Sequence, residues 1–274
     1  MKLKNLFAAA VLAATFVSCG NDTPTDEALG ENDTTAKVIE QQKISAQNVF
    51  NSIPGPTELG RLVEEAGLDY DATLLNNPDD VNKYLSDNFK AMNLGLYGAD
   101  MAYANIHQQS QESMLFLKCV NSLCKNLGIA GVFDEKTVDR LEANKDNKDS
   151  LLTIINKSFL QADAFLRENQ RPHTSSLMVA GGWIEGLYLS AKVGMQSKNK
   201  KFIKKMSEQS QSLSDLITLV ETAKVSGDGV FVLDGLKDLK ISYTKIQSNT
   251  IMSDSVLTEI DAKVTALRNK IILK

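Results

Sequence analysis

The chain has 274 residues, with 30 basic and 34 acidic side chains and a formal net charge of −4 at neutral pH. This length allows one large domain or two small ones. An acidic chain without an arginine-rich stripe argues against nucleic acid as a partner. After the N-terminal region, no stretch of 18 consecutive apolar residues occurs, so we expect no transmembrane helix.

The first twenty residues have the layout of an export signal. Lys2 and Lys4 precede an apolar run over residues 6–17, which is too short for a stable membrane anchor. The run ends in Ser18-Cys19. A small residue directly before a cysteine resembles the lipobox of bacterial lipoproteins, which implies a diacylglycerol on the Cys19 thiol and cleavage in front of it. The alternative is an ordinary export signal beside a chance cysteine.

The residues after Cys19 favour a tether. Residues 20–37 are polar and acidic and show no apolar period, so they cannot bury enough surface to fold. Gly20 is not the Asp that resembles an inner-membrane retention signal, and acidic residues lie close to Cys19. Both points favour the outer membrane, on its periplasmic or surface face. We therefore predict a signal peptide (1–18), a lipidated tether (19–36) and an all-α domain (37–274).

Helical periodicity dominates the rest of the chain, and the only β-rich string is the short run 230–233. Short breaks at proline and glycine separate the helical patterns, so neighbouring helices should run antiparallel. The pattern predicts an all-α bundle of about ten helices, with a possible solenoid tendency. The expected helices lie near residues 37–52, 57–67, 79–108, 111–127, 134–144, 149–169, 174–196, 200–224, 231–248 and 253–271.

Two of these helices are rich in glycine, alanine and aromatic residues: residues 92–107 and 177–191. Each glycine weakens a helix by up to about 1 kcal/mol, so repeated glycine indicates a packing or functional role. The second helix is apolar nearly all round, which is typical of a buried central helix. We expect the two helices to cross at the centre of the bundle, with another backbone approaching Gly98 and Gly182. Similar Gly-Leu-Tyr strings in the two helices hint at a duplication.

Two strings carry a resemblance to a known group. Residues 93–100 read NLGLYGAD and residues 180–188 read AGGWIEGLY. With the Asp-rich joint at 139–149, they are similar to uncharacterised all-helical lipoproteins of the Bacteroidetes. The resemblance covers most of the mature chain and implies no activity.

Catalytic signatures are missing from the sequence. It has no HExxH, GxSxG or P-loop motif and no GxGxxG before a strand, so no catalytic residue is assigned and an enzyme is not favoured. Two histidines cannot make a three-histidine metal site within one chain. We assign no metal ligand and no cofactor.

The best candidate pocket lies on the two Gly-rich helices. Asn93, Asp100 and His107 are seven residues apart and form one stripe. Glu185 is the only charged residue between Arg171 and Lys192, and a buried carboxylate must be paired, hydrogen-bonded or protonated. If the helices cross, these groups could converge on one polar pocket, or they could form a purely structural network. The candidate residues are Asn93, Tyr97, Asp100, Tyr103, His107, Trp183, Glu185 and Tyr188.

Three other features have structural readings that we favour over functional ones. The oxygen-rich joint 139–149 lacks the glycine and terminal glutamate of an EF-hand loop, so helix capping explains it better than calcium. The lysine run 198–205 could touch anionic lipid head groups, but such runs are usually solvated faces. Cys119 and Cys124 are five apart on a helix and point in different directions, which favours buried thiols over a disulfide.

Three functional hypotheses follow, in decreasing order of support. The first is a lipid-anchored envelope protein with a helical binding or scaffold domain for an envelope protein or a small ligand. The second is a metal- or small-molecule-binding protein that uses the polar pocket between the Gly-rich helices. The third is an envelope hydrolase.

Overall fold

The computed structural model describes residues 37, 40, 44, 48 and 49 and the ranges 67–133, 135–247 and 250–273. The chain divides into two units, Met1–Lys37 and Val38–Lys274, and the fold is that of the second unit. Every regular element among the described residues is helical, which confirms the predicted all-α class. The expected signal peptide, the tether and Cys19 lie outside the described residues.

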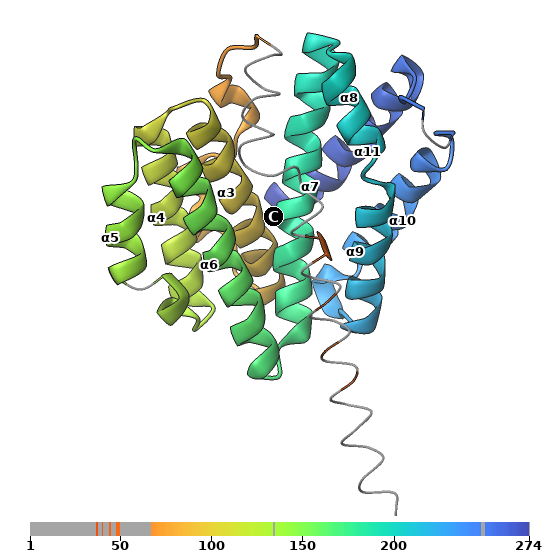
Figure 1. The fold of residues 1–274 in the computed structure, drawn as a ribbon. Coiled ribbons are helices and arrows are strands. Elements are labelled where there is room, and N and C mark those ends of the chain that lie inside the picture. The colour runs from red at the N-terminus through yellow and green to blue at the C-terminus, as the bar shows by residue number, and fades with distance from the viewer. Residues whose placement is uncertain are drawn as a thin grey trace, which may run out of the picture. The chain divides into compact units, whose positions relative to one another are not determined.

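The helices are α3 (Asp87–Ile106), α4 (Ser110–Asn126), α5 (Glu135–Ala143), α6 (Lys148–Glu168), α7 (Pro172–Ser197), α8 (Lys200–Ser207), α9 (Ser210–Thr222), α10 (Phe231–Tyr243) and α11 (Asp254–Ile272). Short 3₁₀ helices are η1 (Ala72–Leu74), η2 (Pro78–Asn82), η3 (Ala130–Phe133) and η4 (Gly227–Gly229). In Figure 1, α3 and α7 run through the middle, with α4, α5 and α6 on one side and α8 to α11 on the other.

Three of the sequence-based helix predictions were wrong in their boundaries, and the helix expected over 231–248 ends at Tyr243. The pattern predicted a helix from residue 79, but Asn77 caps only the short η2, and the Ser86 hydroxyl accepts from Phe89 N to begin α3. The pattern also predicted one helix over 200–224, where the structure has α8 and α9. The Ser207 hydroxyl at the end of α8 accepts a hydrogen bond from Met252 N, 2.9 Å away. No glycine or proline interrupts this segment, and a contact with a distant part of the chain lies at the break.

The helix expected at 37–52 is only partly described. Residues 37, 40, 44, 48 and 49 are helical, and all except Val49 are exposed. Val49 belongs to the buried core. The helix expected at 57–67 lies outside the described residues, apart from its last residue.

The predicted crossing of the two Gly-rich helices is confirmed, because α3 and α7 contact each other closely. A Cβ atom on Gly95 would overlap the backbone of Met178 and Gly182. A Cβ atom on Gly181 would overlap the backbone of Met92. Glycine is therefore required at both positions by the approach of a second backbone rather than by conformational freedom.

Of the two glycines predicted to lie at this contact, Gly182 faces the backbone of Gly95 and Gly98 does not face a backbone. Gly98 faces the ring of Phe159 on α6, which is a side chain and not a backbone. A Cβ atom on Gly182 would lie 3.5 Å from Gly95 O, which is ordinary contact. Gly186 has no atom within 4 Å of its would-be Cβ atom. One face of α7 is thus tightly packed while Gly186 borders open space.

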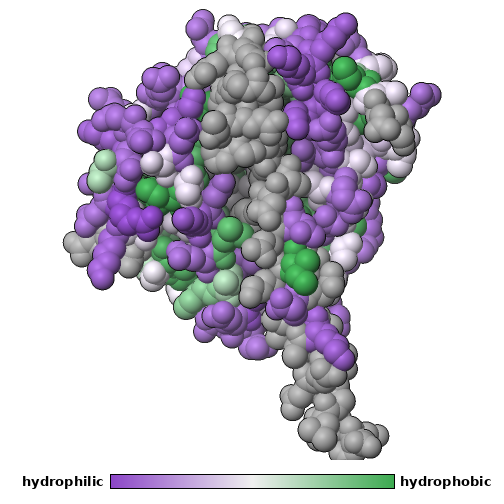
Figure 2. Space-filling model, viewed as in Figure 1, coloured by the Kyte–Doolittle hydropathy of each residue, from purple (hydrophilic) through white to green (hydrophobic). Residues whose placement is uncertain are grey.

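The described surface is mainly hydrophilic on the face drawn in Figure 2, with only small separate hydrophobic areas. The most exposed large apolar side chains are Leu85 and Leu273. None of the described helices is both long enough and apolar enough to cross a bilayer.

Candidate functional site

The α3–α7 crossing separates the candidate residues into two groups. One side of the crossing borders an open groove, and the other side borders a buried cluster of charged and polar groups. Tyr103 and Trp183 belong to the groove. Asp100, Glu185 and Tyr188 belong to the cluster. The single polar pocket expected from the sequence is therefore two separate features.

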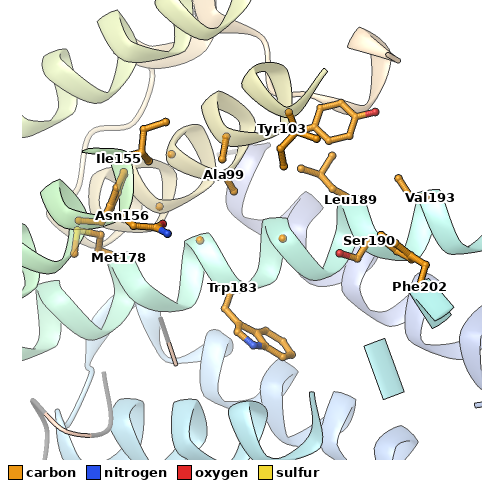
Figure 3. A pocket seen from close by; sticks show the side chains of 17 residues that line it. Ala99, Tyr103, Ile155, Asn156, Met178, Trp183, Leu189, Ser190, Val193 and Phe202 are labelled. Carbon is orange, nitrogen blue, oxygen red and sulfur yellow. The ribbon is translucent and has the colours of Figure 1, made fainter. Parts of the chain in front are cut away.

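The groove lies between α3, α6 and α7, and α8 contributes one side chain to it. It holds about 910 Å³ free of protein atoms, which includes open solvent at its mouth. Figure 3 shows the lining side chains spread along α7, from Met178 at one end to Val193 and Phe202 at the other. The lining residues are Gly95, Gly98, Ala99, Ala102, Tyr103, Ile106, Ile155, Asn156, Phe159, Met178, Gly182, Trp183, Gly186, Leu189, Ser190, Val193 and Phe202.

The lining explains why this space stays open and apolar. Glycine and alanine contribute almost no side-chain volume, so the surfaces of α3 and α7 between the larger side chains are backbone. None of the lining residues that the structure describes carries a charge, and among them Asn156 and Ser190 alone have a polar side chain that is not aromatic. A site of this composition suits an apolar ligand, because a buried ionic group would find no partner here.

Trp183 is the only tryptophan in the chain and lines the groove. Its indole Nε1 donates to Ser212 Oγ on α9, at 2.9 Å. This hydrogen bond holds the ring, which is 4% exposed, against α9. Because Trp183 is part of the lining, its fluorescence can report on changes in the groove.

The buried cluster centres on an ion pair between α7 and α11. Arg268 Nε donates to Glu185 Oε2 at 2.7 Å, and the Glu185 side chain is fully buried. Arg268 Nη2 donates to Leu74 O at 3.0 Å and to Asn76 Oδ1 at 3.1 Å. The guanidinium also lies over the Tyr188 ring, 4.3 Å from its centroid. One arginine thus ties the segment before η2 to the two helices.

Asp100 completes the cluster from α3. Its Oδ2 accepts from Asn76 N at 3.2 Å, and the residue is fully buried. The Asp100 and Glu185 side chains interact with each other. Burial raises the pKa of Asp100 well above its ordinary value, and the charge of Glu185 raises it further. Burial also raises the pKa of Glu185, against the opposing charge of Arg268.

His107 was expected to meet Glu185, and the structure corrects this. His107 follows the last turn of α3, about 10 Å along the helix from Asp100. Its ring lies 4.5 Å from that of Tyr103 and 5.8 Å from that of Tyr70, measured between centroids. Burial lowers the pKa of His107, so burial favours the neutral imidazole. The partner of Glu185 is Arg268 instead, because a buried carboxylate is stabilised by a cation and His107 is too far away.

Asn93 and Tyr97 have structural roles. The Asn93 amide donates to Phe89 O at 2.9 Å and to Ile271 O at 3.4 Å, linking α3 to α11. The Tyr97 hydroxyl donates to Asn77 O at 2.8 Å, which holds the start of η2. Neither residue lines the groove.

Comparisons with protein-family models, with curated proteins and with solved structures find no match for this chain. The resemblance to helical lipoproteins of the Bacteroidetes therefore stays a prediction. Any function has to be argued from the geometry of the groove and the cluster.

The joint 139–149 and the two internal cysteines have the structural roles that their sequence pattern favoured. The Asn147 side chain in the joint caps α6 by accepting from Ser150 N. Among the described residues, no group of three or more His, Cys, Asp or Glu side chains could hold a metal ion. Cys119 and Cys124 are buried free thiols.

Sequence reasoning missed Asn76 and Arg268 in the buried cluster, and Arg268 is the one that carried a signal. In α11 it lies four residues after Val264 and three before Ile271, and both of these are buried. The residue therefore sits on the apolar face of an amphipathic helix, which is a signal that the sequence carries. A basic residue at such a position predicts a buried carboxylate partner, although not which one.

Proposed function

We propose that the protein is a lipid-anchored binding module of the cell envelope, and that its groove takes a ligand with a long hydrocarbon chain. The single observation that carries the proposal is the uncharged groove lined by the glycine-rich faces of α3 and α7. The lipid anchor on Cys19 and the envelope location rest on the sequence alone.

The length of the groove favours a chain-like ligand over a compact one. Its lining on α7 extends from Met178 to Val193, which spans about 22 Å at the rise of an α-helix. On α3 it extends from Gly95 to Ile106, or about 16 Å.

The charge of the groove favours a hydrocarbon. Since none of the described residues that line it is charged, an ionised group would lose its water without gaining a partner among them. Asn156 and Ser190 can each offer one neutral hydrogen-bonding group. A head group, charged or not, would therefore remain at the solvent-facing mouth, with the chain inside.

The alternative function, binding of a metal or polar ligand at Asp100, His107 and Glu185, has less support. Asp100 and Glu185 are fully buried, and Glu185 already has Arg268 as its cationic partner. His107 lies away from both. We therefore place the ligand in the groove and not in the buried cluster.

Trp183 provides the test. A long-chain fatty acid brominated along its chain should quench the fluorescence of Trp183 in a saturable manner, because bromine quenches indole on contact. Gly186→Leu should abolish saturable quenching, because the side chain would enter space that is now open. Gly186→Ala is the matched control and should keep most of the binding. Equal saturable quenching in Gly186→Leu, or none in the unmodified chain, would contradict the proposal.

A further inference from the structure

The cluster behind the groove contains more acidic than basic side chains. Asp100 and Glu185 bring two carboxyl groups, and Arg268 is the one cation in direct contact with either of them among the described residues. If both carboxyl groups were ionised, the buried cluster would carry a net charge of −1. With one proton added it becomes neutral.

The hydrogen bonds of the cluster also indicate one added proton. Within the cluster, Asp100 Oδ1 and Glu185 Oε1 have no hydrogen-bond donor among the described residues, and each atom is fully buried. The other oxygen of each group accepts from Asn76 N or from Arg268 Nε. A proton between the two free oxygens would give each of them a partner.

We propose that Asp100 and Glu185 share one proton, and that the resulting hydrogen bond holds α3 against α7 behind the groove. We call this hydrogen bond the latch. Asp100 carries the proton and donates it to Glu185, while Glu185 keeps the negative charge that Arg268 requires. If both carboxyl groups were ionised, two buried negative charges would repel each other. Separation of α3 and α7, the helices that carry them, would reduce this repulsion.

The position of the pair ties the latch to the groove. The backbones of α3 and α7 are closest at Gly95 and Gly181. Asp100 lies about 7.5 Å beyond Gly95 along α3, and Glu185 lies about 6 Å beyond Gly181 along α7. Gly186, directly after Glu185, lines the groove. Separation at the acid pair would therefore change the width of the groove.

Other titratable and charged groups face the pair from every neighbouring element, and Arg268 is the cation among them that touches it. The segment before α3 contributes Tyr70 and Tyr84, and α4 contributes Cys119. The groups on α3 and α7 are Tyr97, Tyr188 and Lys192, and those on α11 are Asp261 and Arg268. Burial raises the pKa of each tyrosine and of Cys119, so these groups stay neutral while the acid pair titrates. Lys192 is paired with Asp261 at 2.8 Å.

The sign of the pH dependence follows from linkage. Because the native state holds a proton that unfolded Asp100 releases near its ordinary pKa of 3.8, stability falls as the pH rises above that value. One such proton changes the unfolding constant by up to about tenfold per pH unit. Asp100→Asn replaces the proton donor with an amide of the same shape and should remove this dependence.

The test compares unfolding constants of the full chain and of Asp100→Asn at pH 5 and pH 7. From pH 5 to pH 7, the unfolding constant of the unmodified chain should rise at least about tenfold more than that of the variant. Asp163→Asn is the control, because Asp163 is a buried aspartate paired with Arg167 and outside the cluster. It should weaken the fold by a similar factor at both pH values. Identical pH dependence in the unmodified chain and in Asp100→Asn would overturn the shared proton.

Two further measurements keep the proposal testable if Asp100→Asn does not fold. In the unmodified chain labelled with ¹³C at its carboxyl groups, one side-chain carboxyl should still be protonated at pH 7. Absence of such a resonance would overturn the shared proton. Quenching of Trp183 by acrylamide should then increase as this resonance titrates, since the groove widens. Constant quenching across that titration would overturn the latch. Neither measurement uses a ligand, so failure of the hydrocarbon-binding proposal would leave both readouts unchanged.

Discussion

Replacing Arg268 with methionine should destabilise the protein strongly at neutral pH and much less in mild acid. The substitution keeps most of the side-chain volume but removes the cation beside Glu185. Glu185 must then be buried as the neutral acid. Holding it neutral at pH 7, above its ordinary pKa of 4.5, costs about 3.4 kcal/mol. Loss of the hydrogen bonds to Leu74 O and Asn76 Oδ1 costs a further ~0.5–1.5 kcal/mol each.

The expected loss in unfolding free energy is therefore about 4–6 kcal/mol at pH 7, and about 2.7 kcal/mol less at pH 5. The loss is smaller at low pH because Glu185 would have a raised pKa in the folded variant. The folded variant is therefore more stable at low pH and loses stability as the pH rises. Asp100 contributes equally to both proteins and cancels in the difference.

The assay is chemical denaturation of both proteins at the two pH values. Lys263→Met is the control on the same helix, because Lys263 pairs with the exposed Asp238 at 2.8 Å. It should change the unfolding free energy by no more than about 1 kcal/mol at either pH. A loss for Arg268→Met that is the same at pH 5 and pH 7 would refute the charge assignment in the cluster.

Three other predictions test the packing, the anchor and the thiols. Gly95→Ala should cost about 1–3 kcal/mol of unfolding free energy, because the methyl group meets a backbone, whereas Gly186→Ala should stabilise the protein by up to about 1 kcal/mol. Thermal melts that rank these two variants in the opposite order would contradict the crossing. Cys19→Ser should abolish lipid labelling and release the protein from membranes, and continued labelling would end the lipoprotein hypothesis. Burial raises the pKa of Cys119 to about 11 and that of Cys124 to about 12, so both thiols should resist alkylation until the protein unfolds; rapid alkylation of the native protein at neutral pH would argue against their burial.

The helical class could be predicted because apolar periodicity is a local property of the chain. The crossing of the two Gly-rich helices could be predicted too, since glycine weakens a helix interior and repeated glycine there points to close packing against a second helix. Which glycine of α3 meets a backbone could not be predicted, although Gly182 on α7 was placed correctly. Gly95 and Gly98 lie on the same face of α3, and only the position of α6 decides that Phe159 covers Gly98.

Only some members of the candidate site were predicted, and their arrangement was not. A single carboxylate in an apolar helix marked Glu185 as a buried group that needs a partner, and Asp100 does lie beside it. The cation could not be chosen, because it comes from α11, 83 residues further along the chain. The polar and apolar sides of the crossing could not be separated either, since helical periodicity gives the faces of a helix but not the neighbours that cover them.

Native mass spectrometry of the full chain tests the central claim most directly, because it counts molecules held in the groove. After incubation with a long-chain fatty acid and removal of the excess, the unmodified chain and Gly186→Ala should each carry one bound molecule, and Gly186→Leu should carry none. A bound molecule that persists equally in Gly186→Leu, or no bound molecule on the unmodified chain, would contradict a hydrocarbon-binding groove between α3, α6 and α7.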